Sequence, residues 1–310
     1  MYLIFVLRMS KPLDRLTLLE TFTRISDRGS ISAAARDLGL SQASASRQLR
    51  ELETRLGSQL IRRTTHSLAL TPAGQAALAD ARVLISGWEA FEERHAATDG
   101  SIRGPLKLVA PVALGQTFLT DIVVRFQLDH PEVTLEWELE DAPIRFAERG
   151  CDCWIKVGAV PDDSLIVRRL GRVERLVVAS SELAAPRGVT VPAQLQDLPF
   201  IALAPYEGGN LTLHSTDGSS VRVPLDPVMT TNNIVAILAT VRMGAGAAIM
   251  PRWFVADDLA RGKLIDVLPN WRAAELDISV AFLPSPHQPR RLTAFLDALD
   301  LGIKQIPGIA

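Results

Sequence analysis

The sequence predicts a multidomain α+β chain with a small helical head, one long helix and a larger α/β body of two lobes. Three observations predict this fold class. Two closely spaced helices fill residues 29–57, an amphipathic stretch follows over about residues 71–95, and strand and helix patterns alternate from Gly104 onward. In addition, 310 residues with 47% hydrophobic content exceed the length that one core usually supports.

The head is predicted from two short helices joined by a tight turn. Ser30 and Ser41 are expected to cap the two helices, and Gly39 and Gly57 to end them. Three leucines at helical spacing predict the inner face of the second helix: Leu49, Leu52 and Leu56. This is a helix-turn-helix pattern, which favours duplex DNA as the partner. An ordinary Ala-rich helical hairpin is the alternative for this segment taken alone.

The side chains expected to contact DNA lie mainly near the start and on the outer faces of the second helix. They are Ser32, Ser41, Gln42, Ala43, Ser44, Ser46, Arg47 and Arg50. Glutamine can pair with adenine, arginine with guanine or phosphate, and serine with either kind of base edge.

A short basic hairpin with weak strands is predicted over Arg62–Pro72. Such a wing is expected to lie on the phosphate backbone, with a solvated surface loop as the alternative. Its expected contact residues are Arg62, Arg63, Thr64, Thr65 and His66.

The charge is divided unevenly along the chain. Residues 1–71 contain eleven Lys/Arg and six Asp/Glu, a net charge of +5, whereas the remaining residues carry −7 and the whole chain −2. A basic head on an acidic body is expected for a DNA-binding sensor, because the body should not itself bind nucleic acid.

A dense, ordered set of residues between positions 16 and 74 carries a family resemblance. The set is Phe22, Gly29-Ser30, Ala33-Ala34-Ala35, Leu38, Ser41-Gln42, Ser46-Arg47, Leu52-Glu53, Leu56-Gly57, Leu60, Arg62-Arg63-Thr64 and Leu70-Thr71-Pro72-Ala73-Gly74. The segment resembles the LysR-type transcriptional regulators. Three positions depart from the family's usual residues. Ile61 is found where the family usually has Phe, Ala43 where Pro or a small residue is common, and His66 where a basic residue is usual. The resemblance implies a winged helix-turn-helix, a dimerisation linker helix and a two-lobed effector domain similar to periplasmic binding proteins.

The long helix is predicted to begin with Thr71 as its cap and Pro72 at its first position, and to run to about His95 before Asp99-Gly100. Its apolar residues approximate a heptad seam: Leu78, Ala81, Ile85, Trp88 and either Phe91 or Glu92. Pairing with a second copy is the favoured interpretation, and packing on its own domain is the alternative. The resemblance likewise implies dimerisation through this helix, binding to an inverted-repeat operator, and a dimer or tetramer.

The body is predicted to contain strands over 106–109, 133–137, 153–157, 175–179, 244–250, 264–268 and 276–282, and helices over 114–128, 232–243, 253–261 and 289–301. The resemblance implies two lobes, with the chain crossing between them near Arg172–Arg175 and Trp271–Leu276.

The expected domains are an extension over 1–9, a DNA-binding domain over 10–71, a linker helix over 72–98 and an effector domain over 101–303. Within this last domain, one lobe covers about 101–172 and 276–303, and the other about 173–275.

Small-molecule contacts are expected where polar residues open apolar helices, after Pro111 and after Thr230. Free N–H groups there, with Gln116 and Thr117, can hold a carboxylate, although each segment is also a good helix cap. The resemblance implies inducer contacts at both segments. The expected effector contacts are Val112, Ala113, Gly115, Gln116, Thr117, Lys156, Tyr206, Thr231, Asn232 and Asn233.

Other function classes find little support in the sequence. Cys151 and Cys153 lack the further ligands of a zinc site and are too close in one strand for a relaxed disulfide, so we expect no metal, no cofactor and free thiols in a reducing cytoplasm. The apolar run Met1–Leu7 is too short to span a membrane, and no membrane partner is expected. The sequence of the body offers no nucleophile–base pair and no phosphate loop that would indicate an enzyme. We predict a cytoplasmic transcriptional regulator with RNA polymerase as a candidate partner; an enzyme and a ligand-independent DNA-architectural protein are the alternatives.

Overall fold

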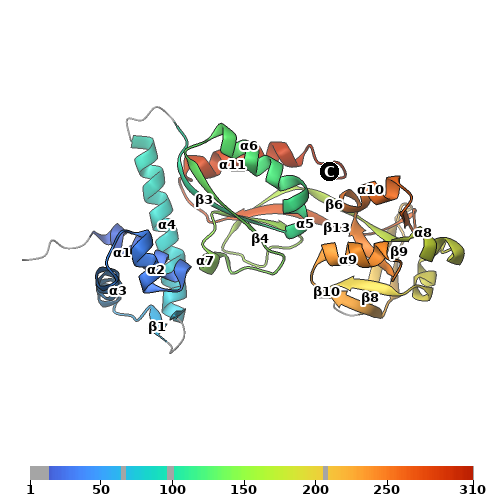
Figure 1. The fold of residues 1–310 in the computed structure, drawn as a ribbon, viewed down its shortest axis with the longest axis horizontal. Coiled ribbons are helices and arrows are strands. Elements are labelled where there is room, and N and C mark those ends of the chain that lie inside the picture. The colour runs from blue at the N-terminus through green and yellow to red at the C-terminus, as the bar shows by residue number, and fades with distance from the viewer. Residues whose placement is uncertain (1–13, 64–67, 96–100, 205–208, 310) are drawn as a thin grey trace, which may run out of the picture. The chain divides into compact units, whose positions relative to one another are not determined.

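A computed structural model describes residues 14–63, 68–95, 101–204 and 209–309 (Figure 1). The chain divides into two compact units. The first comprises residues 1–98, 144–151 and 285–289, and the second comprises the remaining residues. Each unit has its own buried hydrophobic clusters.

The first unit contains a three-helix head, a hairpin and a long helix. Its elements are α1 (Arg15–Arg28), α2 (Ile31–Asp37), α3 (Gln42–Leu56), β1 (Ile61–Arg63), β2 (Leu68–Leu70), α4 (Pro72–His95) and α7 (Phe146–Arg149). Ser30 accepts a hydrogen bond from the Ala33 N–H, and Ser41 accepts one from the Ser44 N–H. The turn that follows α2 and the end of α3 place Gly39 and Gly57 in the left-handed region, each with φ of 65°. The predicted helix-turn-helix signals are therefore confirmed.

The inner face of α3 differs from the prediction at its last turn. Leu49 and Leu52 are buried in the head's core, whereas Leu56 is 51% exposed. All of residues 54–59 are exposed, so this turn projects beyond the core that the three helices share. The buried face instead includes Gln48, whose side chain accepts a hydrogen bond of 2.5 Å from the Thr21 hydroxyl.

The helix α4 begins as predicted, because the Thr71 hydroxyl oxygen accepts a hydrogen bond of 3.0 Å from the Gly74 N–H. Its first half packs on its own head, where Leu78 and Ala81 are buried in the cluster that contains Phe22. The prediction that these two residues belong to a seam between copies is thus wrong. The large apolar side chains exposed on α4 come from its second half: Leu84, Trp88 and Phe91.

The second unit is built on one mixed β-sheet. Its strands are β3 (Gly104–Ala110), β4 (Val133–Leu139), β5 (Cys153–Val157), β6 (Ile166–Ser180), β7 (Phe200–Leu203), β8 (Asn210–Ser215), β9 (Ser220–Pro224), β10 (Pro227–Thr231), β11 (Ala247–Pro251), β12 (Leu264–Asp266) and β13 (Trp271–Phe282). The main strand order is β10-β7-β11-β6-β13-β5-β3-β4, with β12 paired to β6 and the β8–β9 hairpin paired to β13.

Two lobes share this sheet through the long antiparallel strands β6 and β13. Helices flank each lobe: α5 (Val112–Leu114), η1 (Gly115–Leu119), α6 (Thr120–Asp129) and α11 (Arg290–Ile303) on the first, and α8 (Ser181–Ala184), η2 (Ala185–Arg187), η3 (Pro192–Asp197), α9 (Ile234–Arg242) and α10 (Arg252–Ala260) on the second. In the first lobe α6 and α11 lie side by side (Figure 1), and the rings of Phe126 and Phe295 meet edge to face at 5.3 Å.

The predicted helix over 114–128 is interrupted by the π-helical turn η1. The Thr120 hydroxyl donates a hydrogen bond of 2.8 Å to the carbonyl oxygen of Gly115, five residues earlier, which supports the wider turn. The sequence prediction also omitted β7, β8, β9, β10 and the first nine residues of β6. Arginines at 168, 169, 172 and 175 interrupt the apolar pattern of β6, so its length depends on pairing with β13. No described helix combines the length and apolar character needed to cross a membrane.

Candidate functional site

The start of α3 presents an exposed polar surface. Gln42, Ala43, Arg47 and Arg50 are exposed there, Ser44 and Ser46 are half-buried, and Ser41 and Ser32 of α2 are also exposed. Arg50 donates a hydrogen bond from Nε to the Ser46 carbonyl within the helix. Arg47 makes no hydrogen bond or ion pair within the described part of the chain, so its guanidinium is available to an outside partner.

The β1–β2 hairpin is fixed to the far end of the same helix. Glu53 accepts hydrogen bonds from the backbone N–H groups of Leu60 at 2.9 Å and Ile61 at 3.3 Å. These bonds hold the first strand of the hairpin, on which Arg62 is exposed opposite Ala69. The sequence prediction gave Glu53 no such role. The predicted contacts Thr64, Thr65 and His66, and the side chain of Arg63, lie outside the described residues.

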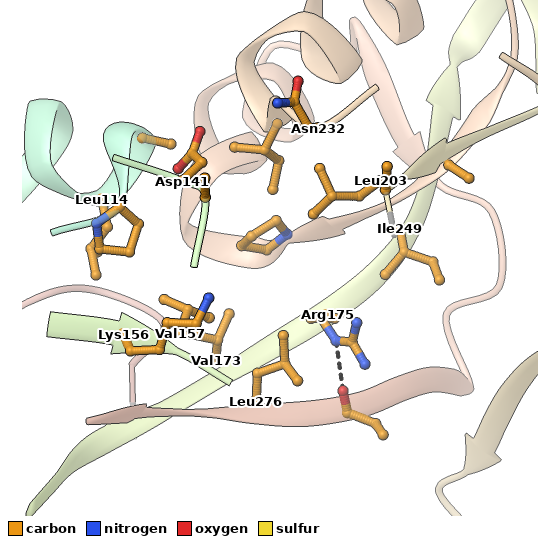
Figure 2. A pocket seen from close by; sticks show the side chains of 18 of the residues that line it. Leu114, Asp141, Lys156, Val157, Val173, Arg175, Leu203, Asn232, Ile249 and Leu276 are labelled. Atoms are coloured by element: carbon orange, nitrogen blue, oxygen red, sulfur yellow. Dashed lines mark hydrogen bonds between the residues drawn. The ribbon is translucent and has the colours of Figure 1, made fainter. Parts of the chain in front are cut away.

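A pocket of about 850 Å³ lies between the two lobes of the second unit (Figure 2). Parallel pairing explains its position. In the first lobe β3 is parallel to both β4 and β5, and in the second β7 is parallel to both β10 and β11. Carboxyl ends of parallel strands meet at one edge of a sheet, and ligands in open α/β folds bind at such edges.

Some predicted effector contacts line this pocket and others do not. Ala113, Lys156 and Asn232 are among its lining residues, whereas Val112, Gly115, Gln116, Thr117, Thr231 and Asn233 are not. Gln116 and Thr117 are on the π-helical turn, where Gln116 is exposed, and Gly115 packs against the Leu139 side chain. Tyr206 lies outside the described residues.

Asp141, which the sequence prediction omitted, occupies the position expected for a ligand carboxylate. It follows the end of β4 and accepts a hydrogen bond of 2.9 Å from the backbone N–H of Val112. Its other oxygen accepts a hydrogen bond of 3.2 Å from the side-chain amide of Asn233, in the second lobe. The Asn233 carbonyl oxygen caps α9 by accepting from the Val235 and Ala236 N–H groups. The first N–H of α5 is therefore already bonded, and Asp141 links the two lobes.

We expect Asp141→Ala and Asn233→Ala to be coupled in stability. Each substitution removes the link between lobes, so the double variant should lose less unfolding free energy than the sum of the single losses, by about 0.5–1.5 kcal/mol. Chemical denaturation of the four proteins measures this coupling. Strictly additive losses would contradict the hydrogen bond between Asp141 and Asn233.

Two cations face the pocket from different strands. Lys156 of β5 lies over the Trp154 ring, with Nζ 5.8 Å from the ring centroid. Arg175 of β6 donates a hydrogen bond of 2.6 Å from Nε to the Ala274 carbonyl oxygen (Figure 2). Burial lowers the pKa of Lys156, an effect that the Asp141 carboxylate opposes, and burial also lowers the pKa of Arg175.

The described residues contain no group of three or more His, Cys, Asp or Glu side chains placed to hold a metal ion. Cys151 and Cys153 are buried and form no disulfide. Apolar side chains make up most of the remaining pocket wall, including Leu114, Val157, Val173, Leu203, Ile249 and Leu276 (Figure 2). The pocket thus suits reversible binding of an organic molecule.

Comparison with known families decides the identity. The family described as "LysR substrate binding domain" matches residues 99–301, and that described as "Bacterial regulatory helix-turn-helix protein, lysR family" matches residues 16–75. The chain belongs to the LysR family. It is a LysR-type transcriptional regulator with a helix-turn-helix DNA-binding domain and an effector-binding domain, and not an enzyme. LysR-type regulators bind promoter DNA and small-molecule effectors and form oligomers. The predicted family, fold class and function are therefore confirmed.

Several relatives of this LysR-type regulator are regulators themselves. An HTH-type transcriptional regulator of Xanthomonas campestris pv. campestris (strain 8004) is 30% identical over 287 residues, 90% of this chain and 82% of the relative. The HTH-type transcriptional activator AaeR of Escherichia coli (strain K12) is 25% identical over 93% of each chain. A full-length variant of OxyR from Pseudomonas aeruginosa has the same fold, with a TM-score of 0.73, 17% identity, and coverage of 95% of this chain and 99% of that one.

Proposed function

We propose that this regulator reads an inverted-repeat operator through the start of α3, with the β1–β2 hairpin on the phosphate backbone. Arg47 is the side chain that carries the proposal, because it is exposed and without a partner in the described part of the chain. Two classes of contact are proposed. Bases are read by Gln42, Ser44, Ser46, Arg47 and Arg50, with Ser32, Ser41 and Ala43 beside them, and phosphates are bound by Arg62, Arg63, Thr64, Thr65 and His66.

The proposed assembly is a dimer or tetramer of this chain in which α4 pairs with the α4 of a second copy. Leu84, Trp88 and Phe91 recur at helical spacing and are 58%, 45% and 45% exposed. Burying such a stripe against a second copy removes apolar surface from water. A two-fold dimer also matches the symmetry of an inverted repeat. The proposed domains are 10–71, 72–98 and 101–303, preceded by an extension over 1–9.

The proposed effector site is the pocket between the two lobes. A carboxylate ligand there would contact the cations Lys156 and Arg175 and the indole N–H of Trp253, which has no acceptor in the described structure. The full-length LysR-type regulator LysG from Corynebacterium glutamicum, described with bound effector Arg, shares the fold at a TM-score of 0.63 and 20% identity, over 93% of this chain and 99% of that one. A ligand can shift the regulator only by preferring one arrangement of the lobes. The site of action is the cytoplasm, where promoters and RNA polymerase are available.

Selection of genomic fragments by the full chain, followed by footprinting, tests this proposal. We expect protection of two half-sites related by a dyad, with centres about one helical turn apart or a multiple of it. The matched control is Arg187→Ala, which changes an exposed arginine of the second unit and should protect the same sites. Enrichment of unrelated fragments, or protection of a single half-site, would contradict the proposal.

A further inference from the structure

The two cations of the pocket wall have no direct ion-pair partner among the described residues, although the Asp141 carboxylate acts on Lys156 through space and partly offsets the lowering of its pKa by burial. Neither Lys156 nor Arg175 forms an ion pair in the described part of the chain, and Arg175 uses only Nε for its hydrogen bond to Ala274. Both side chains are half-buried. A partly desolvated cation without a counter-ion is costly, and an anionic ligand would offset that cost.

The acidic side chains of the same wall are already bonded. Asp141 accepts hydrogen bonds from Val112 and Asn233, and Glu140 accepts one of 3.0 Å from the Ala142 N–H. The indole N–H of Trp253, a further lining residue that is only 8% exposed, is buried without a hydrogen-bond acceptor in the described structure. The described groups of this wall that are left without a full set of partners are therefore hydrogen-bond donors, which need acceptor atoms from a ligand.

Strand register separates the two cations. Lys156 lies opposite Ser279 and Arg175 lies opposite Ala273, on strands that flank β13 on its two sides. Six residues of strand correspond to about 20 Å between backbone positions. The two charged side chains therefore extend into the pocket from well-separated backbone positions on different strands. Figure 2 shows the apolar side chains of Val173 and Leu276 between them.

The space between the cations is apolar and large. A pocket of about 850 Å³ lies towards the upper end of the range that holds drug-sized ligands. Lys156 belongs to β5 of the first lobe, whereas Arg175 pairs with Pro251 of β11 in the second lobe. A ligand that contacts both cations therefore contacts both lobes.

We propose that the effector is an organic dianion with an acidic group at each end of an apolar spacer, one group bound by Lys156 and the other by Arg175. This inference rests on the proposed effector site and names the chemical class of its ligand. Because each end binds a different lobe, the length of the ligand determines how well both contacts form together. A diacid therefore favours the arrangement of the lobes in which the distance between the two cations matches the distance between its acidic groups.

Calorimetric titration of the full chain with matched compounds tests the proposal. The probes are octanedioate, decanedioate and dodecanedioate, with decanoate and decane-1,10-diol as the monoacid and neutral counterparts of decanedioate. We expect at least one diacid to bind about 10-fold or more tightly than decanoate, because the monoacid cannot make the second charge-assisted hydrogen bond. The diol should bind more weakly than either.

Pocket variants assign each acidic group to its cation. Lys156→Met and Arg175→Met should each lower diacid affinity to near that of decanoate, while leaving decanoate binding to the remaining cation. Arg175→Lys keeps the charge and should retain part of the preference for the diacid. The control Lys263→Met, an exposed lysine of the second lobe, should change nothing. Thermal unfolding of each variant verifies that it is folded.

Three results would overturn the inference: equal affinity for decanedioate and decanoate, a diacid preference that survives both Met substitutions, or no binding by any diacid. Tight binding of a neutral or cationic compound in the pocket would also contradict the proposal that the effector is a dianion, but it would still support the pocket as the effector site. The proposed function fails separately, if the full chain selects no operator or if no small molecule of any class binds the pocket.

Discussion

Replacing Arg47 with Ala is expected to weaken binding to the selected operator by about 10- to 100-fold, with little change in binding to unrelated DNA. The reason is the position of the side chain. Arg47 is exposed near the start of α3, in the second helical turn after the cap formed by Ser41, and no described residue competes for its guanidinium. Because a side chain at this position reads a base edge, its removal lowers specificity rather than general affinity.

Arg62→Ala is the informative comparison, because Arg62 is exposed on β1 of the hairpin. Removing a phosphate-binding side chain should weaken all sequences alike and flatten the slope of log affinity against log salt by about 1. Arg55→Ala serves as a control, since Arg55 lies at the end of α3 and pairs with Glu51. Fluorescence anisotropy at several salt concentrations, with operator and scrambled duplexes, separates these effects. Equal, sequence-independent losses from Arg47→Ala and Arg62→Ala would defeat the assignment of base reading to α3.

Gly74→Ala is expected to destabilise the head by about 2–3 kcal/mol. Gly74 lies in the first turn of α4, where the chain passes against the backbone of Leu60. An added Cβ would overlap the Leu60 carbonyl oxygen and lie 2.9 Å from its carbonyl carbon. Because both partners are backbone, neither can move aside as a flexible side chain would. The same contact includes a hydrogen bond of 2.9 Å from the Thr71 N–H to the Leu60 carbonyl oxygen.

Gly87→Ala provides the matched control within the same helix. A Cβ at residue 87 would meet nothing within 4 Å in the single chain, so we expect this substitution to stabilise α4 of one copy by about 0.5–1 kcal/mol through its higher helix propensity. Differential scanning calorimetry of the full chain should show the head's transition lowered by about 8 °C or more for Gly74→Ala and slightly raised for Gly87→Ala. Shifts of the same sign and size in both variants would show that Leu60 does not restrict residue 74.

The parts of this fold that depend on residues close together in the sequence could be predicted. The caps Ser30, Ser41 and Thr71 each bond an N–H group three residues later, so their pattern is visible in a short stretch of chain. The seam on α4 shows the limit of such patterns. Periodicity indicated that Leu78 and Ala81 face a partner, and it does not distinguish a second copy from the chain's own head.

The pocket required information that is not local. Ala113, Lys156 and Asn232 were predictable because each lies near the end of a strand or the start of a helix. Asp141 also follows a strand end, and the same rule applied to β4 would have found it. Arg175 gave no comparable signal, because it lies within β6 and reaches the pocket only through the register of β6 against β13.

Ligand binding in the pocket and operator binding by the head are expected to be energetically coupled. The most direct measurement is the affinity of the full chain for its selected operator with and without a saturating amount of whichever panel compound binds most tightly. We predict a change of about 5-fold or more, with the operator changing the affinity for that compound by the same factor, since coupling between two binding sites is reciprocal. Unchanged operator affinity, together with unchanged ligand affinity on saturating operator, would contradict control of the head by the pocket.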